Sequence, residues 1–145
     1  MTMALGFLAA PEPVWVWPVS HGKQVVREFD APNSPWGAGH RGIDLAARAG
    51  DDVIAPVSGV VYFSGSVVDR GVLTIKTGSG QLVTLEPVDA HVTSGRVRAG
   101  QLVGTVSTGH CDGGCLHIGL RVDGEYRSPA RELGISTRAV LRPLD

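Results

Sequence analysis

The sequence predicts an all-β fold with tight turns. Its 145 residues suggest one domain that is long enough to bury a core. Twenty glycines and nine prolines divide the chain into short segments. Several of these segments are rich in β-branched residues or alternate apolar with polar residues, which is the pattern of short strands. Short strands bounded by turn residues favour an all-β class.

The first half of the chain contains three regions with strand character. Residues 14–17 (Val-Trp-Val-Trp) form a short apolar segment that ends at a proline. Residues 24–29 lead into a loop rich in Pro, Asn and Ser. An apolar, β-branched series covers residues 53–63 and is interrupted by a proline and a glycine. We therefore expect several short strands here rather than one long strand.

The clearest alternation comes in the middle of the chain. Residues 72–77 alternate apolar and polar side chains, which predicts a half-buried strand. The turn sequence Gly-Ser-Gly follows, and residues 81–85 are expected to return as the partner strand. Pro87 would remove a backbone donor from a central strand, so it marks a strand end or a bulge. Residues 102–106 form another short strand.

A hairpin and a helix are expected near the C-terminus. Residues 116–122 and 125–127 flank the dipeptide Asp-Gly, which is a strong signal for a two-residue hairpin turn. Ser128 and Pro129 then suit the N-cap and first position of a short helix over residues 130–133.

Composition excludes two classes of partner. The net charge is −1 and the Lys and Arg residues are scattered, so no basic stripe for nucleic acid is present. No apolar run approaches the roughly 20 residues of a membrane span. Residues 1–13 are interpreted as a leader or the remnant of a secretory signal, although they lack its positively charged start. The predicted domain covers residues 14–134, and residues 135–145 form a tail.

His40 and Asp44 are the first candidate metal ligands. They lie four residues apart, but Gly42 and the β-branched Ile43 argue against a helix that would place them on one face. In a straight strand the two residues would be roughly 13 Å apart, which is too far for one ion. A bend at Gly42 is therefore needed to bring them together.

Cys115 and His117 are the second pair of candidates. They lie two residues apart in an apolar run, so a strand places both on one face. Three ligands drawn from His and Asp suit zinc, and a set of three leaves a coordination position for water.

The pattern around these residues resembles a known family. Residues 40–45 (His-Arg-Gly-Ile-Asp-Leu) are similar to the His-x-Gly-x-Asp-Leu motif of the lysostaphin/LytM-type zinc endopeptidases, which cut peptidoglycan peptides. The resemblance extends from about Trp17 to Leu133. It implies an antiparallel β-sandwich or open barrel, a zinc ion held by His40, Asp44 and His117, a peptidoglycan peptide as substrate, and a secreted or cell-wall location.

The sequence departs from the family at two positions that take part in the reaction. Cys115 stands at the first histidine of the family's His-x-His motif, and Pro87 stands where a histidine on a central strand is expected. Glu86 and His110 are the remaining candidates for the base. Alternation turns Glu86 and Pro87 to opposite faces, so we expect Glu86 to reach the metal only if Pro87 bends the strand.

These departures leave two interpretations of the function. The first is a zinc endopeptidase with weakened catalysis, and the alternative is a degenerate relative that binds zinc, the wall or a partner protein without cutting. Residues 50–60 also resemble part of the lipoyl and biotinyl carrier domains. Neither Lys23 nor Lys76 lies at a predicted hairpin tip, where those domains are modified, so this third interpretation is poor.

The cysteines Cys111 and Cys115 have more than one expected state. The glycines between them allow a small ring to close, and an oxidising compartment would favour a disulfide. If Cys115 is free, its thiolate could instead be the fourth zinc ligand, which would make the site closed and structural. A buried free thiol is the third alternative. The disulfide is the interpretation we favour.

Overall fold

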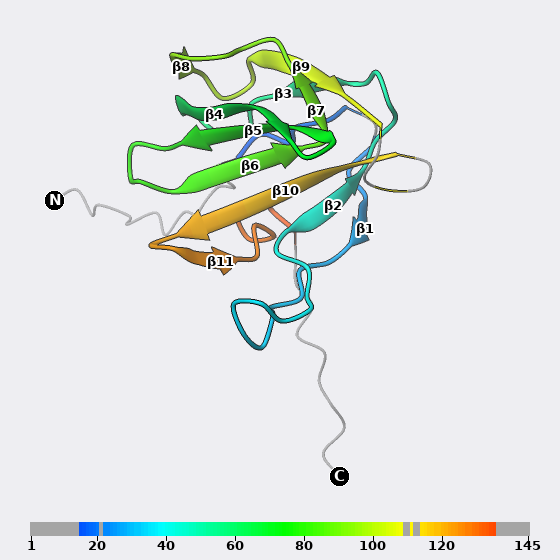
Figure 1. Ribbon diagram of the computed structural model, residues 1–145. Helices are drawn as coiled ribbons and strands as arrows, with labels where there is room; N and C mark the ends of the chain where they lie inside the picture. The colour runs from blue at the N-terminus through cyan, green and yellow to red at the C-terminus, as the bar shows by residue number, and fades with distance from the viewer. Residues whose placement is uncertain (1–14, 21, 109–110, 112–113, 136–145) are drawn as a thin grey trace, which may run out of the picture.

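The computed structural model describes residues 15–20, 22–108, 111 and 114–135, and all regular elements in this part of the chain are strands (Figure 1). The strands are β1 (Val25–Arg27), β2 (Ile43–Ala46), β3 (Asp52–Ile54), β4 (Gly59–Val67), β5 (Arg70–Lys76), β6 (Leu82–Glu86), β7 (Val88–Ala90), β8 (Arg96–Val97), β9 (Leu102–Val106), β10 (Cys115–Val122) and β11 (Glu125–Arg127). This confirms the predicted all-β class.

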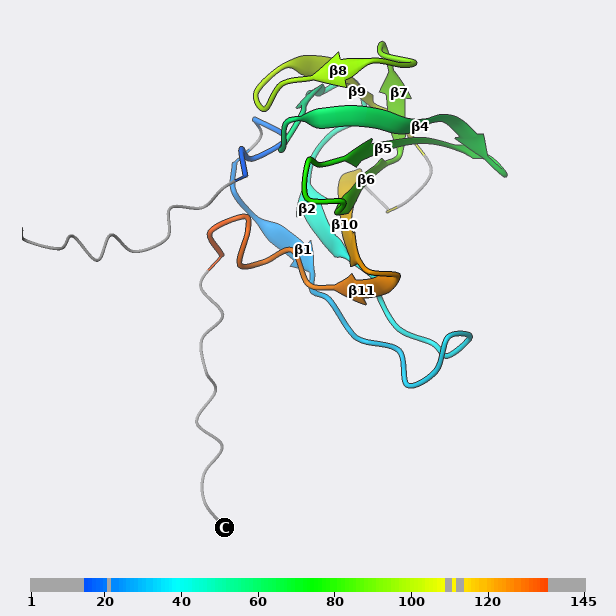
Figure 2. The same ribbon diagram turned by 90° about the vertical axis from the view of Figure 1, so that its left-hand side faces the viewer.

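The strands form two antiparallel sheets. The large sheet has the order β1-β2-β10-β6-β5-β4-β8, with β11 paired to β10, and the small sheet has the order β3-β9-β7. Figures 1 and 2 show the small sheet beside the β4 and β8 end of the large sheet. Strand β6 belongs to the large sheet and β7 to the small one, so Pro87 lies where the chain passes between them. Pro87 thus marks a strand end, as predicted.

One hydrophobic core lies between the sheets, and strand alternation separates it from the functional face. On β10, Leu116 and Ile118 are buried in the core, whereas His117 and Gly119 line a pocket on the other face of the sheet. Strand β6 alternates between the two faces in the same way, and its Leu85 lies in the core. Val53 and Val103 of the small sheet complete the same cluster. The apolar residues of each strand therefore fix which polar side chains face outward.

The strands predicted in the middle and C-terminal parts of the chain are present. The segments expected at 72–77, 81–85 and 102–106 correspond to β5, β6 and β9. Strands β10 and β11 form the predicted hairpin. Asp123 and Gly124 have φ angles of 51° and 81°, and a positive φ at both central residues is what a type I′ turn requires.

The prediction of a strand over residues 14–17 is wrong for residues 15–17, which the structure describes. Backbone N–H groups there donate to loops, with Trp15 bonded to the carbonyl of Glu132 (3.3 Å) and Val16 to that of Pro56 (2.9 Å). Only Val19 forms an isolated bridge, to Val53. The side chains of Trp15 and Trp17 still pack in or against the core, whereas Val16 is exposed, so the tryptophans reflect burial rather than pairing in a sheet.

The prediction of a short C-terminal helix is also wrong, since residues 130–133 form a single turn. The N–H of Ile135 donates to the carbonyl of Ala130 (2.8 Å), and the N–H of Gly134 donates to that of Arg131 (3.1 Å). Gly134 has a φ of 73°. These two bonds with a left-handed glycine resemble the Schellman motif that closes a helix. The closure follows so soon after Pro129 that no helical residues can be added between the two.

The expected leader and tail cannot be assigned from the structure. Residues 1–14 and 136–145 lie outside the described part of the chain, so the leader and most of the predicted tail are not tested. Within the described residues, no helix has the length and apolar character needed to cross a membrane.

Candidate metal centre

The loop before β2 delivers His40 to the sheet and then bends. His40 forms a bridge with Asp30, through N–H to carbonyl bonds of 2.8 and 2.9 Å in the two directions. The chain bends at Arg41 and Gly42 before β2 begins at Ile43. This is the bend that the spacing of His40 and Asp44 required, and it brings Nε2 of His40 to 3.1 Å from Oδ1 of Asp44.

Gly42 is needed at this bend because the site closes over it. A Cβ atom at this position would lie 2.5 Å from Nε2 of His117 and would also collide with the carbonyl oxygen of Ile118. A distance of 2.5 Å is far inside van der Waals contact. The packing around Gly42 therefore leaves no room for a side chain.

Replacing Gly42 with alanine is expected to displace His117 and to lower stability by about 1–3 kcal/mol, the usual range for an overpacked site. Thermal unfolding and zinc affinity would measure the two effects. Gly78→Ala is the matched control, because a Cβ there meets no atom within 4 Å. A Gly42→Ala variant with unchanged melting temperature and zinc affinity would contradict this interpretation.

Strand register brings the third residue into place. His117 on β10 is paired with Asp44 on β2. Its Nδ1 lies 2.8 Å from Oδ1 of Asp44 and 3.2 Å from Nε2 of His40. The exposed fractions of His40, Asp44 and His117 are only 6%, 3% and 8%. The three side chains are thus buried together, with one ligand atom of each facing the same point.

The hydrogen bonds of His40 make this cluster suited to a cation. Its Nδ1 lies 2.8 Å from the carbonyl oxygen of Glu28, which can only accept, so Nδ1 carries the proton. In the neutral ring, Nε2 then presents a lone pair toward the carboxylate of Asp44 and the ring nitrogen of His117. A metal ion among these atoms would turn a repulsive contact into coordination. A backbone partner that fixes the outer nitrogen is typical of histidines that bind metals.

The separations also suit zinc after a small movement. Zinc bonds of about 2.0–2.2 Å in a tetrahedral arrangement place ligand atoms roughly 3.3 Å apart. The observed separations are 2.8 to 3.2 Å, so outward shifts of a few tenths of an ångström would be enough. His40, Asp44 and His117 could therefore hold one zinc ion.

The two cysteines are joined by a disulfide beside this cluster. Cys111 is bonded to Cys115, and Sγ of Cys111 lies 4.0 Å from Oδ2 of Asp44. Cys115 is almost entirely buried at the start of β10. In this state neither sulfur has a thiolate to offer a metal, so the three-residue set stays open at one position.

The disulfide is expected to persist in protein isolated without reductant. Because the chain contains two cysteines in total, a thiol reagent should detect none in the unfolded, unreduced protein and two after reduction. Detection of two free thiols in protein taken from its native compartment would contradict the prediction.

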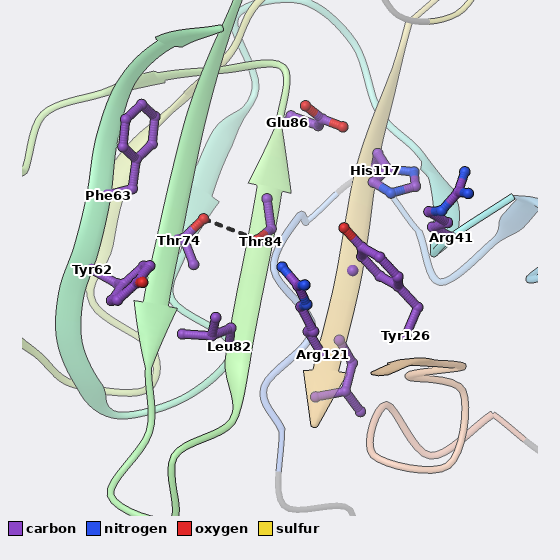
Figure 3. A pocket seen from close by; sticks show the side chains of 12 residues that line it. Arg41, Tyr62, Phe63, Thr74, Leu82, Thr84, Glu86, His117, Arg121 and Tyr126 are labelled. Atoms are coloured by element: carbon purple, nitrogen blue, oxygen red, sulfur yellow. Dashed lines mark hydrogen bonds between the residues drawn. The ribbon is translucent and has the colours of Figure 1, made fainter. Parts of the chain in front are cut away.

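Glu86 faces the metal cluster without any distortion of its strand. It is paired with His117 in the β6–β10 register, and residues directly opposite each other point to the same face. Figure 3 shows the Glu86 carboxylate beside the ring of His117. The chain does bend at Pro87, after β6, but Glu86 already lies on this face through the regular pairing of β6 with β10, so its direction does not depend on that bend. Oε1 of Glu86 lies 3.9 Å from Nη1 of Arg70. His110, the other candidate base, lies outside the described residues.

A pocket of about 380 Å³ runs from His117 of the metal cluster across the large sheet (Figure 3). Its floor includes Thr74 and Thr84, whose hydroxyls share a hydrogen bond of 2.9 Å across β5 and β6. The lining residues are Arg41, Tyr62, Phe63, Thr74, Leu82, Thr84, Glu86, His117, Gly119, Leu120, Arg121 and Tyr126.

Several of these residues were not identified from the sequence. Arg121 follows His117 by four residues on β10, so alternation from His117 could have predicted its face. Tyr126 is paired with Arg121 across the Asp-Gly hairpin, so the same turn signal could have placed it. Tyr62 and Phe63 carried no such signal, because their exposure depends on the position of β4 in the sheet.

The described geometry matches a known group of proteins. Residues 38–129 match the sequence model of peptidase family M23. The chain belongs to this family. The match covers more than half of the chain and includes His40, Asp44 and His117. It confirms the resemblance to the lysostaphin/LytM-type enzymes, which are M23 peptidases. M23 proteins typically use zinc, and they act on peptidoglycan.

Two curated relatives are longer than this chain. The protein named uncharacterized protein Rv2891 from Mycobacterium tuberculosis is 40% identical over 107 residues, covering 71% of this chain and 43% of the relative. The murein hydrolase activator NlpD from Escherichia coli is 26% identical over 137 residues, covering 86% of this chain and 32% of NlpD. The chain therefore spans less than half the length of these two relatives.

A solved structure supports the M23 fold. A zinc-containing peptidase from Vibrio cholerae superposes with a TM-score of 0.66 at 22% sequence identity, covering 77% of this chain and 37% of that one. At this level of identity the similarity establishes the shared fold of antiparallel sheets.

Proposed function

We propose that this chain is a zinc-binding M23 metalloendopeptidase domain that acts on peptidoglycan peptides in the cell wall, with weakened catalysis. The observation that carries the proposal is the convergence of His40, Asp44 and His117, the last of which lines the pocket. Their ligand atoms lie within 3.2 Å of one another. Three buried protein ligands leave a position for reaction chemistry, whereas structural zinc sites are usually closed by four.

The roles of the residues follow from their places in the pocket. When bound, zinc supplies a Lewis acid that polarises a peptide carbonyl and makes water a better nucleophile near neutral pH. His40, Asp44 and His117 would hold the ion. Glu86, opposite His117, would accept the proton of the attacking water, and Arg70 would keep its carboxylate oriented. His110 is the second candidate for this base.

Catalysis is expected to be slow because two proton-transfer groups of the family are missing. Cys115 is bonded to Cys111 and has no proton to give, and Pro87 has no polar side chain. Loss of one positioned acid or base commonly costs about 10²–10⁴-fold in rate. Glu86 would recover part of this loss, since a carboxylate can act as a base but does not supply the hydrogen bonds of a histidine.

The test combines metal analysis with an assay of cleavage. Competition with a chromophoric chelator should give one zinc per chain, and zinc-loaded protein should slowly release new amino groups from purified peptidoglycan. Failure of the folded protein to bind zinc would reject the proposal. The chain would then need another explanation for its buried histidine and aspartate cluster.

A second candidate function is that of a degenerate relative that binds zinc, the wall or a partner protein without cutting. The observation that favours it is the disulfide at the position of a family histidine. The relative NlpD is named a murein hydrolase activator. This alternative predicts zinc binding with no release of amino groups. It also predicts faster peptidoglycan digestion when the chain is added to a separate murein hydrolase.

We also propose a location in the secreted or cell-wall compartment. M23 proteins that act on peptidoglycan work outside the cytoplasm, where their substrate is found. The disulfide supports this proposal because such bonds persist in oxidising compartments.

A further inference from the structure

One wall of the pocket combines two arginines with an aromatic ring. Cζ of Arg121 lies 5.3 Å from the centroid of the Tyr126 ring, and Cζ of Arg41 lies 5.8 Å from it. Figure 3 shows Tyr126 between the two arginines, with His117 nearby. We refer to Arg41, Arg121 and Tyr126 as the arginine–tyrosine wall. Two positive charges are thus gathered around one ring in the same pocket as the metal cluster.

Neither of these charges has a carboxylate partner among the residues that the structure describes. Arg41 donates through Nη2 to the carbonyl of Pro35 (2.9 Å) and Arg121 donates through Nε to that of Gly124 (3.3 Å). A guanidinium has five N–H donors, so each arginine keeps donors for another acceptor. Like charges around one ring repel each other unless an anion lies between them.

The two arginines are also held in place. Each has a backbone hydrogen bond and a cation–π contact with the same ring, and both contacts restrict side chains that would otherwise be flexible. A guanidinium that is already oriented loses less entropy when it binds a ligand. The arrangement therefore favours binding of a planar anion, and carboxylate is the anion that arginine binds through two parallel hydrogen bonds.

We infer that the arginine–tyrosine wall is a subsite for a free carboxylate of the peptide substrate. The inference rests on the proposed function, because it assumes that the pocket binds a peptide. His117 and Arg121 are four residues apart on β10, which is roughly 13 Å along the strand. An extended peptide in the pocket advances by about 3.3 Å per residue. The recognised carboxylate therefore lies roughly two to four residues from the bond that faces the metal centre.

The subsite makes the domain selective for one chemical form of peptide. A carboxylate accepts charge-assisted hydrogen bonds from the arginines, whereas a carboxamide in the same place brings two N–H donors toward groups that can only donate. Peptides in which this carboxylate is amidated should therefore bind more weakly. The difference should decrease as salt is added, because the arginine side chains are reached by solvent.

Binding of matched peptides to the zinc-loaded full chain tests the inference. The probes are a peptidoglycan stem tetrapeptide and versions with its carboxylates amidated one at a time, measured by calorimetry at low salt. One amidation should weaken binding by about tenfold or more, as expected for charge-assisted bonds. In Arg121→Gln and Arg41→Gln, the ratio of the affinities for the free and the amidated peptide should fall toward one. Arg127→Gln is the control, because Arg127 is exposed on β11 and does not line the pocket.

Each outcome separates this inference from the proposed function. Equal binding of all the peptides, no detectable binding to zinc-loaded protein, or an equal loss of preference in Arg127→Gln would overturn the subsite. None of these results would alter the zinc stoichiometry on which the proposed function depends. Loss of zinc binding together with a retained carboxylate preference would instead reject the proposed function and keep the subsite.

Discussion

Replacing His117 by alanine is expected to abolish zinc binding and, with it, any cleavage of peptidoglycan. Its Nδ1 lies within 3.2 Å of the ligand atoms of both His40 and Asp44, so its removal leaves two protein ligands on an ion that needs more. Zinc affinity should fall by well over 10²-fold, beyond the 10–100-fold typical of residues that only orient ligands. Competition with a chelator would measure this loss.

The control for His117→Ala is His91→Ala, because His91 is exposed in a loop and belongs to none of the possible metal clusters among the described residues. Both variants should keep the circular dichroism spectrum of a β protein. If His117→Ala bound zinc as tightly as the wild type, the metal centre proposed here would be wrong. A loss of affinity of similar size in His91→Ala would mean that the zinc site lies elsewhere.

Glu86→Gln is expected to lower the rate of peptidoglycan cleavage by about 10²–10⁴-fold and to leave zinc affinity nearly unchanged. Glutamine keeps the size of the side chain but cannot accept a proton as a carboxylate does. Glu86 lies opposite His117 and is not one of the three converging ligands. The effect should therefore be on rate rather than on metal content. Release of amino groups by zinc-loaded protein would give the rate.

Two further variants make the Glu86 result decisive. Glu125→Gln removes a carboxylate from an exposed position on β11 and should have no effect. His110→Gln tests the second candidate base. Robust cleavage that survives Glu86→Gln but is abolished by His117→Ala would leave the metal assignment intact and reject Glu86. If His110→Gln then reduced the rate, the base would be assigned to His110.

Much of the fold could be predicted because its signals are local. The alternation over residues 72–77 and the Asp123–Gly124 turn depend only on nearby residues, and both gave the correct elements. The segment 14–17 failed because its apolar character reflects burial against distant loops, which propensity does not distinguish from pairing in a sheet. The short helix failed because Gly134 closes the turn immediately.

The candidate site was predictable to a different extent. His40, Asp44 and His117 were identified from ligand type, spacing and family resemblance, and the bend at Gly42 followed from the distance that those ligands must cover. The direction of Glu86 depends on the register between β6 and β10, which no local pattern specifies. The arginine–tyrosine wall requires the pairing of β10 with β11, which the Asp-Gly turn indicates, and a loop contact from Arg41, which no local pattern specifies.

The central place of β10 links assembly of the sheet to the metal. His117 is opposite Asp44 on one neighbouring strand and opposite Glu86 on the other. A slip of one residue between any two of these strands would turn a site residue to the other face. Zinc occupancy in a refolded sample would therefore report the fraction of molecules with native strand pairing. Supplying zinc during refolding should favour that fraction, because only correctly paired chains can bind it tightly.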